Sequence, residues 1–254
     1  MTEYSERPKD KTENIEINWS ALASKGFLTP DNVNYRLSEE YRAIKRPLIN
    51  NALNGKVKGI SRSNLILITS SLPNEGKTYS AINLAVSIAC ERDKNVLLID
   101  ADIPKPSVAK TLDIHYKYGL TDYLDGTIEN FSDSILQTNL KDLSIICSGK
   151  HHSYSTELFA SNRMQQLVNE LTEAYSDRII IIDSAPLLAT TQGEVLASMA
   201  GQIVLVVEAE QTPQEVVLES IRRLKSNDVV LLLLNKSRNN VDINYYGYGQ
   251  YGNI

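Results

Sequence analysis

The fold of this chain is decided by residues 65–78, which read Leu-Ile-Leu-Ile-Thr-Ser-Ser-Leu-Pro-Asn-Glu-Gly-Lys-Thr. The unbroken apolar run at the start predicts a strand that is buried on both faces of a sheet. A stretch with the apolar spacing of a helix, residues 79–90, follows the loop at once. Strand, loop and helix in this order bring backbone N–H groups and the positive end of a helix dipole together, which suits a phosphate.

The loop also carries the side chains that a phosphate chain requires. Lys77 supplies a cation and Thr78 supplies a hydroxyl for magnesium, and Gly76 allows the tight turn before them. The spacing matches Gly-x-x-x-x-Gly-Lys-Thr, the Walker A motif, except that Ser71 stands at the first glycine. We therefore expect a nucleotide site whose binding residues here are Ser71, Pro73, Asn74, Glu75, Gly76, Lys77, Thr78 and Tyr79.

Short apolar runs alternate with helical stretches along the rest of the chain. Further strands are expected at residues 96–99, 143–146, 179–182, 203–207 and 229–234, and helices at residues 157–175, 193–199 and 214–224. Continuous rather than alternating apolar runs favour parallel strands that helices cover on both faces. The predicted fold class is α/β, a three-layer sandwich with a mostly parallel sheet.

Three aspartates come directly at the ends of predicted strands. Asp100 and Asp102 follow the second run, and Asp183 follows the fourth. Ligands bind at the carboxyl edge of an open parallel sheet. One such aspartate is as consistent with a helix cap as with a ligand site, but together with residues 71–78 the three favour a nucleotide site with magnesium.

Two other segments resemble nucleotide-binding motifs in part. Gly247-x-Gly249-x-x-Gly252 has the letters of a dinucleotide fingerprint, but no strand precedes it and no helix can follow it. Residues 235–238, Asn-Lys-Ser-Arg, lack the aspartate that would take a guanine edge, so ATP is preferred over GTP. Asn235 is equally consistent with reading adenine and with ending a strand in a turn.

Three segments are expected along the chain. Residues 1–36 have no sustained period and predict a flexible extension, and residues 37–240 form the domain. A helix is expected from Ser38, with Pro47 kinking or ending it. Residues 241–254 form a tail in which tyrosines alternate with glycines; the tyrosines are Tyr245, Tyr246, Tyr248 and Tyr251.

Composition narrows the function classes. A net charge of −5 over 254 residues disfavours a general nucleic-acid binder. Cys90 and Cys147 are far apart with no metal-binding spacing, so we expect free, core-type cysteines. The longest apolar runs have about six residues, against the roughly 20 of a membrane span, and no signal peptide precedes them. A cytoplasmic protein is expected.

The motifs resemble those of the bacterial tyrosine kinases of capsule and exopolysaccharide systems, and most of all the stand-alone autokinases of exosortase-associated loci. The resemblance rests on residues 70–78 as Walker A, 98–106 as Walker A′ and 181–186 as Walker B, together with the tyrosine tail. It implies a P-loop NTPase fold of the ParA and MinD kind. The family has arginine where Pro104 stands, which leaves Lys105 as the basic residue of Walker A′. ParA and MinD relatives carry an extra lysine where this chain has Leu72, which favours the kinase branch.

The resemblance also implies roles for individual residues. Thr78, Asp102 and Asp183 would hold Mg²⁺ or its waters, and Asp100 would accept the tyrosine proton, although it could exchange roles with Asp102. Lys77 would neutralise the β- and γ-phosphate oxygens of ATP. The full catalytic set is Lys77, Asp100, Asp102 and Asp183. The family's oligomerisation helix, Glu-x-x-Arg-x-x-Arg, is followed by Glu39, Arg42 and Lys45, for which a solvated surface is the alternative.

The function implied is ATP-dependent autophosphorylation of the tail tyrosines in a homo-oligomeric ring, where each tail enters the neighbouring active site. It would regulate polysaccharide synthesis or export. The partners implied are other copies of the chain and a membrane adaptor of the polysaccharide chain-length or co-polymerase type, which would hold it at the inner face of the cytoplasmic membrane. The alternatives are a ParA/MinD-like ATPase switch, in which the tyrosines are only adhesive, and a nucleotide-binding scaffold without turnover.

Overall fold

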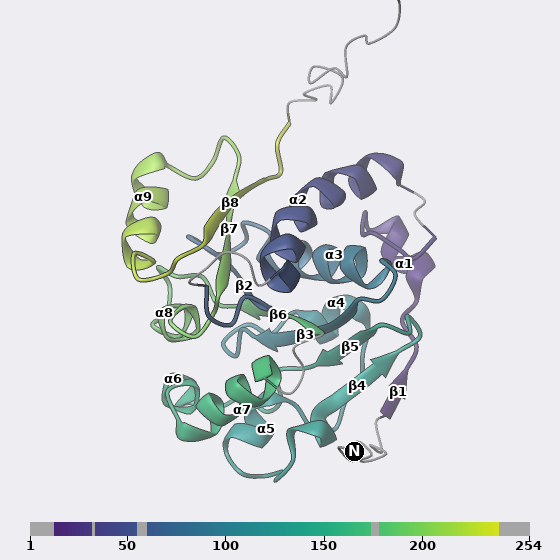
Figure 1. Cartoon of the computed structure of the whole chain (residues 1–254), viewed down its shortest axis with the longest axis vertical. Coiled ribbons are helices and arrows are strands. Elements are labelled where there is room, and N and C mark those ends of the chain that lie inside the picture. The colour runs from purple at the N-terminus through teal and green to yellow at the C-terminus, as the bar shows by residue number, and fades with distance from the viewer. Residues whose placement is uncertain (1–12, 32–33, 55–59, 174–177, 239–254) are drawn as a thin grey trace, which may run out of the picture.

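The computed structural model describes residues 13–31, 34–54, 60–173 and 178–238 (Figure 1). Its centre is an eight-stranded sheet with the order β1-β4-β5-β3-β6-β2-β7-β8. All neighbouring strands are parallel except β4 and β5. The strands are β1 (Glu13–Ile15), β2 (Leu65–Ser70), β3 (Asn95–Ala101), β4 (Ile135–Thr138), β5 (Leu143–Ile146), β6 (Arg178–Ser184), β7 (Gln202–Glu208) and β8 (Val230–Asn235).

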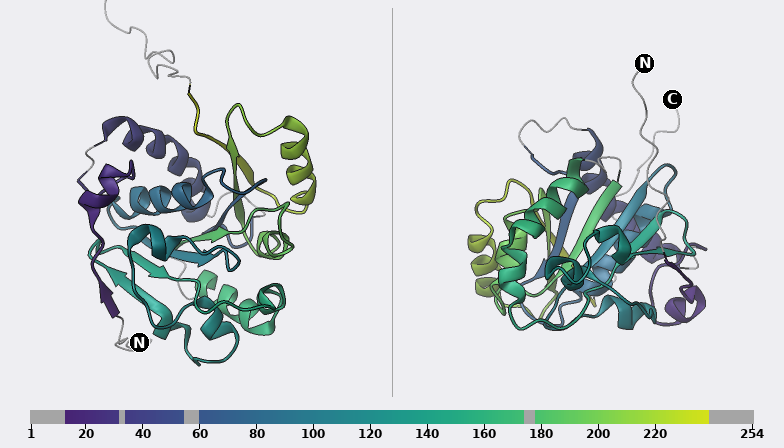
Figure 2. Two further views of the ribbon diagram at one scale, coloured as in Figure 1. Left: turned by 180° about the vertical axis from the view of Figure 1, so that it is seen from behind. Right: turned by 90° about the horizontal axis from the view of Figure 1, so that it is seen from below.

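Helices cover both faces of this sheet, as the views in Figures 1 and 2 show. One face carries α1 (Trp19–Ser24), α2 (Tyr35–Asn54), α3 (Lys77–Ala89) and α4 (Val108–Leu112). The other carries α5 (Leu120–Leu124), α6 (Ser155–Phe159), α7 (Asn162–Glu173), α8 (Gln192–Ala197) and α9 (Gln214–Arg223), with a 3₁₀ turn at Phe131–Ser134. The predicted three-layer α/β sandwich with a mostly parallel sheet is confirmed.

Two hydrophobic cores explain why the strands are apolar without alternation. In β2, Leu65 and Leu67 join the core under α5 to α9, while Ile66 and Ile68 join the core under α1 to α4. All four side chains are 0% exposed. Successive side chains of a strand point to opposite faces, so a sheet covered on both sides needs apolar residues at every position.

The N-terminal segment packs on the domain, contrary to the flexible extension expected through residue 36. β1 pairs in parallel with β4, and Ile17, Leu22 and Leu28 are each at most 3% exposed. The backbone N–H of Leu28 donates to the side chain of Asn83 on α3 at 2.7 Å. A three-residue strand has no readable period, and its order comes from these tertiary contacts. Residues 1–12 lie outside the described part of the chain.

Helix boundaries differ from the predictions in two places. The helix expected over residues 157–175 is two helices, α6 and α7, that meet near Ser161. α2 begins at Tyr35 rather than after Ser38 and continues through Pro47. Among the described helices none is long and apolar enough to cross a membrane. The four tail tyrosines, Tyr245, Tyr246, Tyr248 and Tyr251, lie outside the described residues.

Candidate functional site

The phosphate loop, residues 71–76 between β2 and α3, contains two residues with left-handed backbone. Asn74 has a φ of 69° and Gly76 a φ of 97°. Asparagine tolerates this conformation better than most residues, and glycine adopts it freely. A side chain at Gly76 is excluded by space as well, because a Cβ there would lie 2.0 Å from Nδ2 of Asn235. Ser71 does not have a positive φ, so a serine fits where the motif has its first glycine.

Lys77, the first residue of α3, forms an ion pair with a carboxylate from the next strand end. Its Nζ lies 2.6 Å from Oδ2 of Asp102, and the Lys77 side chain is 11% exposed. Burial alone would lower the pKa of Lys77, but the carboxylates of Asp183 and Asp102 outweigh it and raise the pKa. The lysine therefore carries a full charge that an anionic ligand can use.

Thr78 and Asp183 form a second polar pair beside the first. The Thr78 hydroxyl donates to Oδ2 of Asp183 at 2.6 Å. Oδ1 of Asp183 is buried and has no hydrogen-bond partner in the described structure. Burial raises the pKa of Asp183 to about 8, and the nearby Lys77 opposes this shift. A buried oxygen without a partner is costly unless a ligand or ion completes it.

Strand register brings the three aspartates together. β3 lies directly beside β6, and Asp100 and Asp183 are register partners across this pair. Asp100 is saturated, because its carboxylate accepts from the backbone N–H groups of Asp102, Ser107 and Val108 at 2.9–3.2 Å. Burial raises its pKa to about 6, although those three N–H groups lower it. Oδ2 of Asp100 thus anchors the start of α4, and Oδ1 holds the backbone of Asp102.

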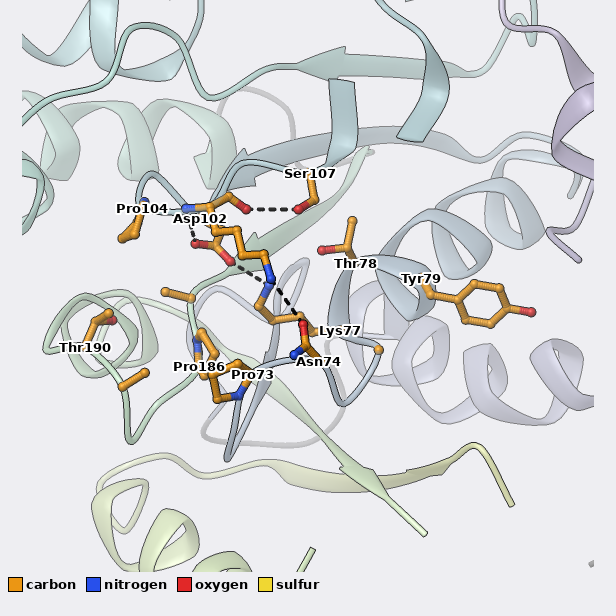
Figure 3. Close-up of a pocket in the computed structure, with 14 residues that line it drawn as sticks. Pro73, Asn74, Lys77, Thr78, Tyr79, Asp102, Pro104, Ser107, Pro186 and Thr190 are labelled. Carbon is orange, nitrogen blue, oxygen red and sulfur yellow. Dashed lines mark hydrogen bonds and ion pairs between the residues drawn. The ribbon is translucent and has the colours of Figure 1, made fainter. Parts of the chain in front are cut away.

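A cavity of about 370 Å³ opens where these groups converge (Figure 3). Lys77, Thr78 and Asp102 line it, whereas Asp100 does not. Most of the remaining wall comes from the loops after β3 and β6, whose residues were not among those predicted to bind nucleotide. They could have been predicted from their closeness in sequence to Asp102 and Asp183. These residues are Pro104, Ser107, Ala185, Pro186, Ala189 and Thr190.

Lys105 reaches across this cavity from the loop after β3. Its Nζ donates to Oδ1 of Asn74 at 3.2 Å, and its backbone N–H donates to Oδ1 of Asp102 at 3.1 Å. The side chain is exposed, and Pro104 beside it also lines the cavity. The basic residue that the sequence left for Walker A′ therefore does face the phosphate loop.

Two residues expected to bind nucleotide instead hold the loop to the rest of the domain. Glu75 is 2% exposed, and its carboxylate accepts from the N–H of Leu72 at 2.6 Å and from the Thr212 hydroxyl. Ser71 is fully buried and accepts from the Ser220 hydroxyl at 2.8 Å. Neither side chain lines the cavity.

Tyr79 and Asn235, two further candidates for the nucleotide site, also contact other parts of the chain. Tyr79 lines the cavity, but its ring points away from Asp102 and Pro186 in Figure 3. Its hydroxyl donates to the carbonyl of Gly26 at 2.7 Å, and its ring centroid lies 4.8 Å from that of Phe27. Asn235 is outside the cavity, and its Nδ2 donates to the backbone carbonyl of Glu75 at 2.9 Å.

The expected interface set on α2 does not share one exposed face. Glu39 and Arg42 pair with each other at the surface. Lys45 is 5% exposed and turns inward, where its Nζ donates to the carbonyl of Ser87 at 2.5 Å and pairs with Glu91 at 2.9 Å. Lys45 thus joins α2 to α3 within the chain, and the prediction that it bridges subunits is corrected.

Sequence relatives of this chain are named as tyrosine kinases. Residues 64–232 match the family model described as an AAA domain. The tyrosine-protein kinase YwqD of Bacillus subtilis (strain 168) is 33% identical over 178 residues, covering 70% of this chain and 71% of that protein. The tyrosine-protein kinase ptk of Acinetobacter johnsonii is 30% identical over 169 residues. The match covers 66% of this chain but only 22% of that longer protein.

Solved structures agree with these relatives. The VpsO kinase domain is 30% identical with a TM-score of 0.61, covering 76% of this chain and 98% of that one. The chimerical protein CapA2B2 is 26% identical with a TM-score of 0.67, covering 87% and 92%. MinD of Pyrococcus horikoshii OT3, complexed with Mg-ADP, is 21% identical with a TM-score of 0.57 over 68% and 71%, which shows the fold alone.

Proposed function

The chain belongs to the bacterial tyrosine-protein kinases, and on that premise we propose that it transfers the γ-phosphate of ATP to tyrosines of its own C-terminal tail. The acceptors proposed are Tyr245, Tyr246, Tyr248 and Tyr251. In this reaction the bond between the γ-phosphorus and the β,γ-bridging oxygen breaks, a phosphotyrosine ester forms, and ADP leaves. The tyrosine gives up its phenolic proton.

One observation carries this proposal: Lys77, Thr78 and Asp102 line a single cavity, and Asp183 holds the Thr78 hydroxyl beside it. Lys77 would bind β- and γ-phosphate oxygens, exchanging its ion pair with Asp102 for the more highly charged ligand. N–H groups of the phosphate loop and the start of α3 would hold the rest of the phosphate chain. Glu75 and Ser71 would then contact ATP through their backbone N–H groups rather than through their side chains.

Mg²⁺ fits the same corner. The described residues contain no group of three His, Cys, Asp or Glu side chains that could hold a metal on their own. Asp183 nevertheless has a buried oxygen without a partner, next to the Thr78 hydroxyl and near Asp102. Such a set suits a magnesium ion that also takes phosphate oxygens and waters. Bound there, Mg²⁺ would neutralise charge on the transferring phosphoryl group.

Asp102 is the better candidate to accept the tyrosine proton. A general base must be within hydrogen-bond reach of the proton that it takes. Asp102 lines the cavity, whereas Asp100 does not line it, and three backbone N–H groups hold the carboxylate of Asp100. We therefore assign Asp100 to positioning the loop after β3, and Asp102 to the cavity.

We extend the proposal to a role in polysaccharide synthesis or export, at the inner face of the cytoplasmic membrane, through a membrane adaptor of the co-polymerase type. The support is the motif resemblance and relatives such as the tyrosine-protein kinase of the Klebsiella pneumoniae cps region. The adaptor's cytoplasmic segment should raise the rate of phosphorylation. An equal rate with and without any co-encoded membrane protein would contradict this part.

Intact-mass measurement and peptide mapping after incubation with ATP and Mg²⁺ test the central claim. The wild-type chain should gain phosphates on peptides that contain residues 245–251. A Lys77→Met variant, shown by thermal melting to be folded, should gain none. Phosphate released to water with an unmodified tail would point instead to a ParA/MinD-like switch, and ATP bound without turnover would point to a scaffold.

A further inference from the structure

The end of β8 contacts the phosphate loop through two consecutive residues. Asn235 Nδ2 donates to the backbone carbonyl of Glu75 at 2.9 Å. Lys236 Nζ donates to the backbone carbonyl of Asn74 at 2.7 Å. Two adjacent side chains therefore hold two adjacent carbonyls of the loop, and we call this pair of contacts the carbonyl clamp.

The clamp is itself anchored. Asn235 is the register partner of Glu208 across β7 and β8, and its carbonyl accepts from the N–H of Ala209 at 2.8 Å. Lys236 has a left-handed φ of 59° and pairs with Oε2 of Glu208 at 2.9 Å. The fit is close at Gly76 as well, where any Cβ would collide with the Asn235 amide. The clamp thus fixes the phosphate loop relative to β7 and β8.

Peptide geometry gives the clamp a chemical consequence. In a planar trans peptide the C=O and the N–H point in opposite directions, and the described residues contain no cis peptide. Holding the carbonyl of Glu75 on the β8 side therefore turns the N–H of Gly76 away from β8. No described residue accepts a hydrogen bond from that N–H. Gly76 lines the cavity, while Asn235 and Lys236 do not.

We propose that Asn235 and Lys236 are positioning residues for the phosphate loop. They keep the carbonyls of Glu75 and Asn74 turned outward, so that the cavity meets N–H groups rather than carbonyl oxygens, which would repel phosphate. Asn235 accordingly acts on the phosphates of the nucleotide through the loop and does not read adenine. This inference rests on the proposed nucleotide site and deepens it.

The discriminating experiment compares ligands with and without a base. Dissociation constants of the full chain for ATP, GTP and inorganic tripolyphosphate are measured for wild type and Asn235→Ala, with Mg²⁺ present. A lost hydrogen bond to the loop should weaken all three ligands by the same factor, about two- to tenfold. If Asn235 reads adenine, ATP weakens, tripolyphosphate does not, and the proposal is overturned.

Variants of Lys236 test the clamp independently, and one of them should restore ligand binding. Lys236→Met should weaken all three ligands, and Lys236→Arg should restore them, because a guanidinium can donate to the same carbonyl and pair with Glu208. Lys225→Met, which removes an exposed lysine that does not line the cavity, is the matched charge control and should change nothing. In kinase assays Lys236→Met should raise KM for ATP more than it lowers kcat.

The outcomes separate this inference from the proposed function. Wild type that binds tripolyphosphate while Asn235→Ala and Lys236→Met bind it equally well overturns the clamp and leaves the nucleotide site standing. Wild type that binds none of the three ligands overturns the proposed function and the clamp with it. If Asn235→Ala does not fold, as judged by thermal melting, the Lys236 variants decide.

Discussion

The Nζ of Lys77 lies 2.6 Å from Oδ2 of Asp102, although Lys77 begins the helix after β2 and Asp102 follows β3. The loop lysine is therefore paired with a carboxylate of the same chain. A phosphate chain has to compete with a nearly buried carboxylate for the same ammonium group. The pair makes the energy of nucleotide binding depend on a residue of a different strand.

Replacing Asp102 should separate binding from catalysis. In Asp102→Asn the ammonium loses its competing charged partner, so the affinity for ADP measured without Mg²⁺ should rise by about tenfold or more, since a hydrogen bond to a charged group contributes about 1.5–3 kcal/mol. Tail phosphorylation should fall about 10²-fold or more, because a proton acceptor is lost. Calorimetric titration and a phosphorylation time course measure the two effects. Weaker ADP binding by Asp102→Asn would contradict this account of the ion pair.

Asp183 should make the stability of the metal-free protein depend on pH. Its pKa is about 8 when folded and about 4 when unfolded. Between these values the folded state holds a proton that the unfolded state releases, so this carboxyl lowers the free energy of unfolding as pH rises from about 4 to about 8. In Asp183→Asn that cost is absent.

Thermal melting with a chelator present, at intervals from pH 5 to pH 9, measures this linkage. The melting temperature of Asp183→Asn minus that of wild type should increase as pH rises, and this difference should level off above about pH 8. A difference that stays constant over the whole range would show that Asp183 is already ionised in the folded protein.

Arg42 and Lys45 should give opposite results when each is changed. Lys45→Ala leaves the Ser87 carbonyl and Glu91 without their partner, which costs about 1–3 kcal/mol and a few degrees of melting temperature. Arg42→Ala removes only a surface pair and should melt as wild type does. If this face of α2 joins subunits, light scattering should show a lower mass for Arg42→Ala. An unchanged mass would show that this face of α2 does not join subunits.

Phosphate transfer is expected between chains. Asn235 and Lys236, which precede the tail, do not line the cavity, and in the proposed ring each tail would enter the site of a neighbouring chain. Tyr245 is nine positions beyond Lys236, a reach of about 30 Å when the segment is fully extended.

A mixture of two variants tests this. Lys77→Met keeps its tyrosines but is inactive, and the second variant has the four tail tyrosines changed to phenylalanine and an intact site. Phosphate should form on the Lys77→Met chain, as peptide mass mapping would show. Its absence, when wild type alone is modified, would mean that each chain phosphorylates its own tail.

The central sheet and the phosphate loop were predictable because each rests on local sequence. The run at residues 143–146 matches β5 to the residue, and Lys77 and Thr78 stand where the Walker A spacing puts them. The strands β1 and β4, of three and four residues, were not predicted, because strands this short are ordered by pairing with their neighbours rather than by a sequence pattern.

The roles of individual polar residues were less predictable. Asp100 and Asp102 stand two positions apart in one motif, and the structure distinguishes them by the three N–H groups on Asp100 and by the Lys77 ion pair of Asp102. Helical spacing predicted an exposed Lys45, one turn after Arg42. Its side chain instead points inward, and its Nζ donates to the carbonyl of Ser87. Asn235 was equally consistent with reading adenine and with ending a strand, and the contact of its amide with the Glu75 carbonyl could not be read from the sequence. Contacts between distant segments are set by the packed fold.

The contact between Tyr79 and residues 26–27 has a practical consequence for anyone shortening this protein. A truncated version that starts at residue 37, where the sequence suggests that the domain begins, would strip Gly26 and Phe27 from Tyr79, the residue next to Thr78. It would also remove Leu22 and Leu28 from the core and the N–H that satisfies Asn83. Expression clones meant for assays or crystals should therefore start no later than Glu13, where β1 begins.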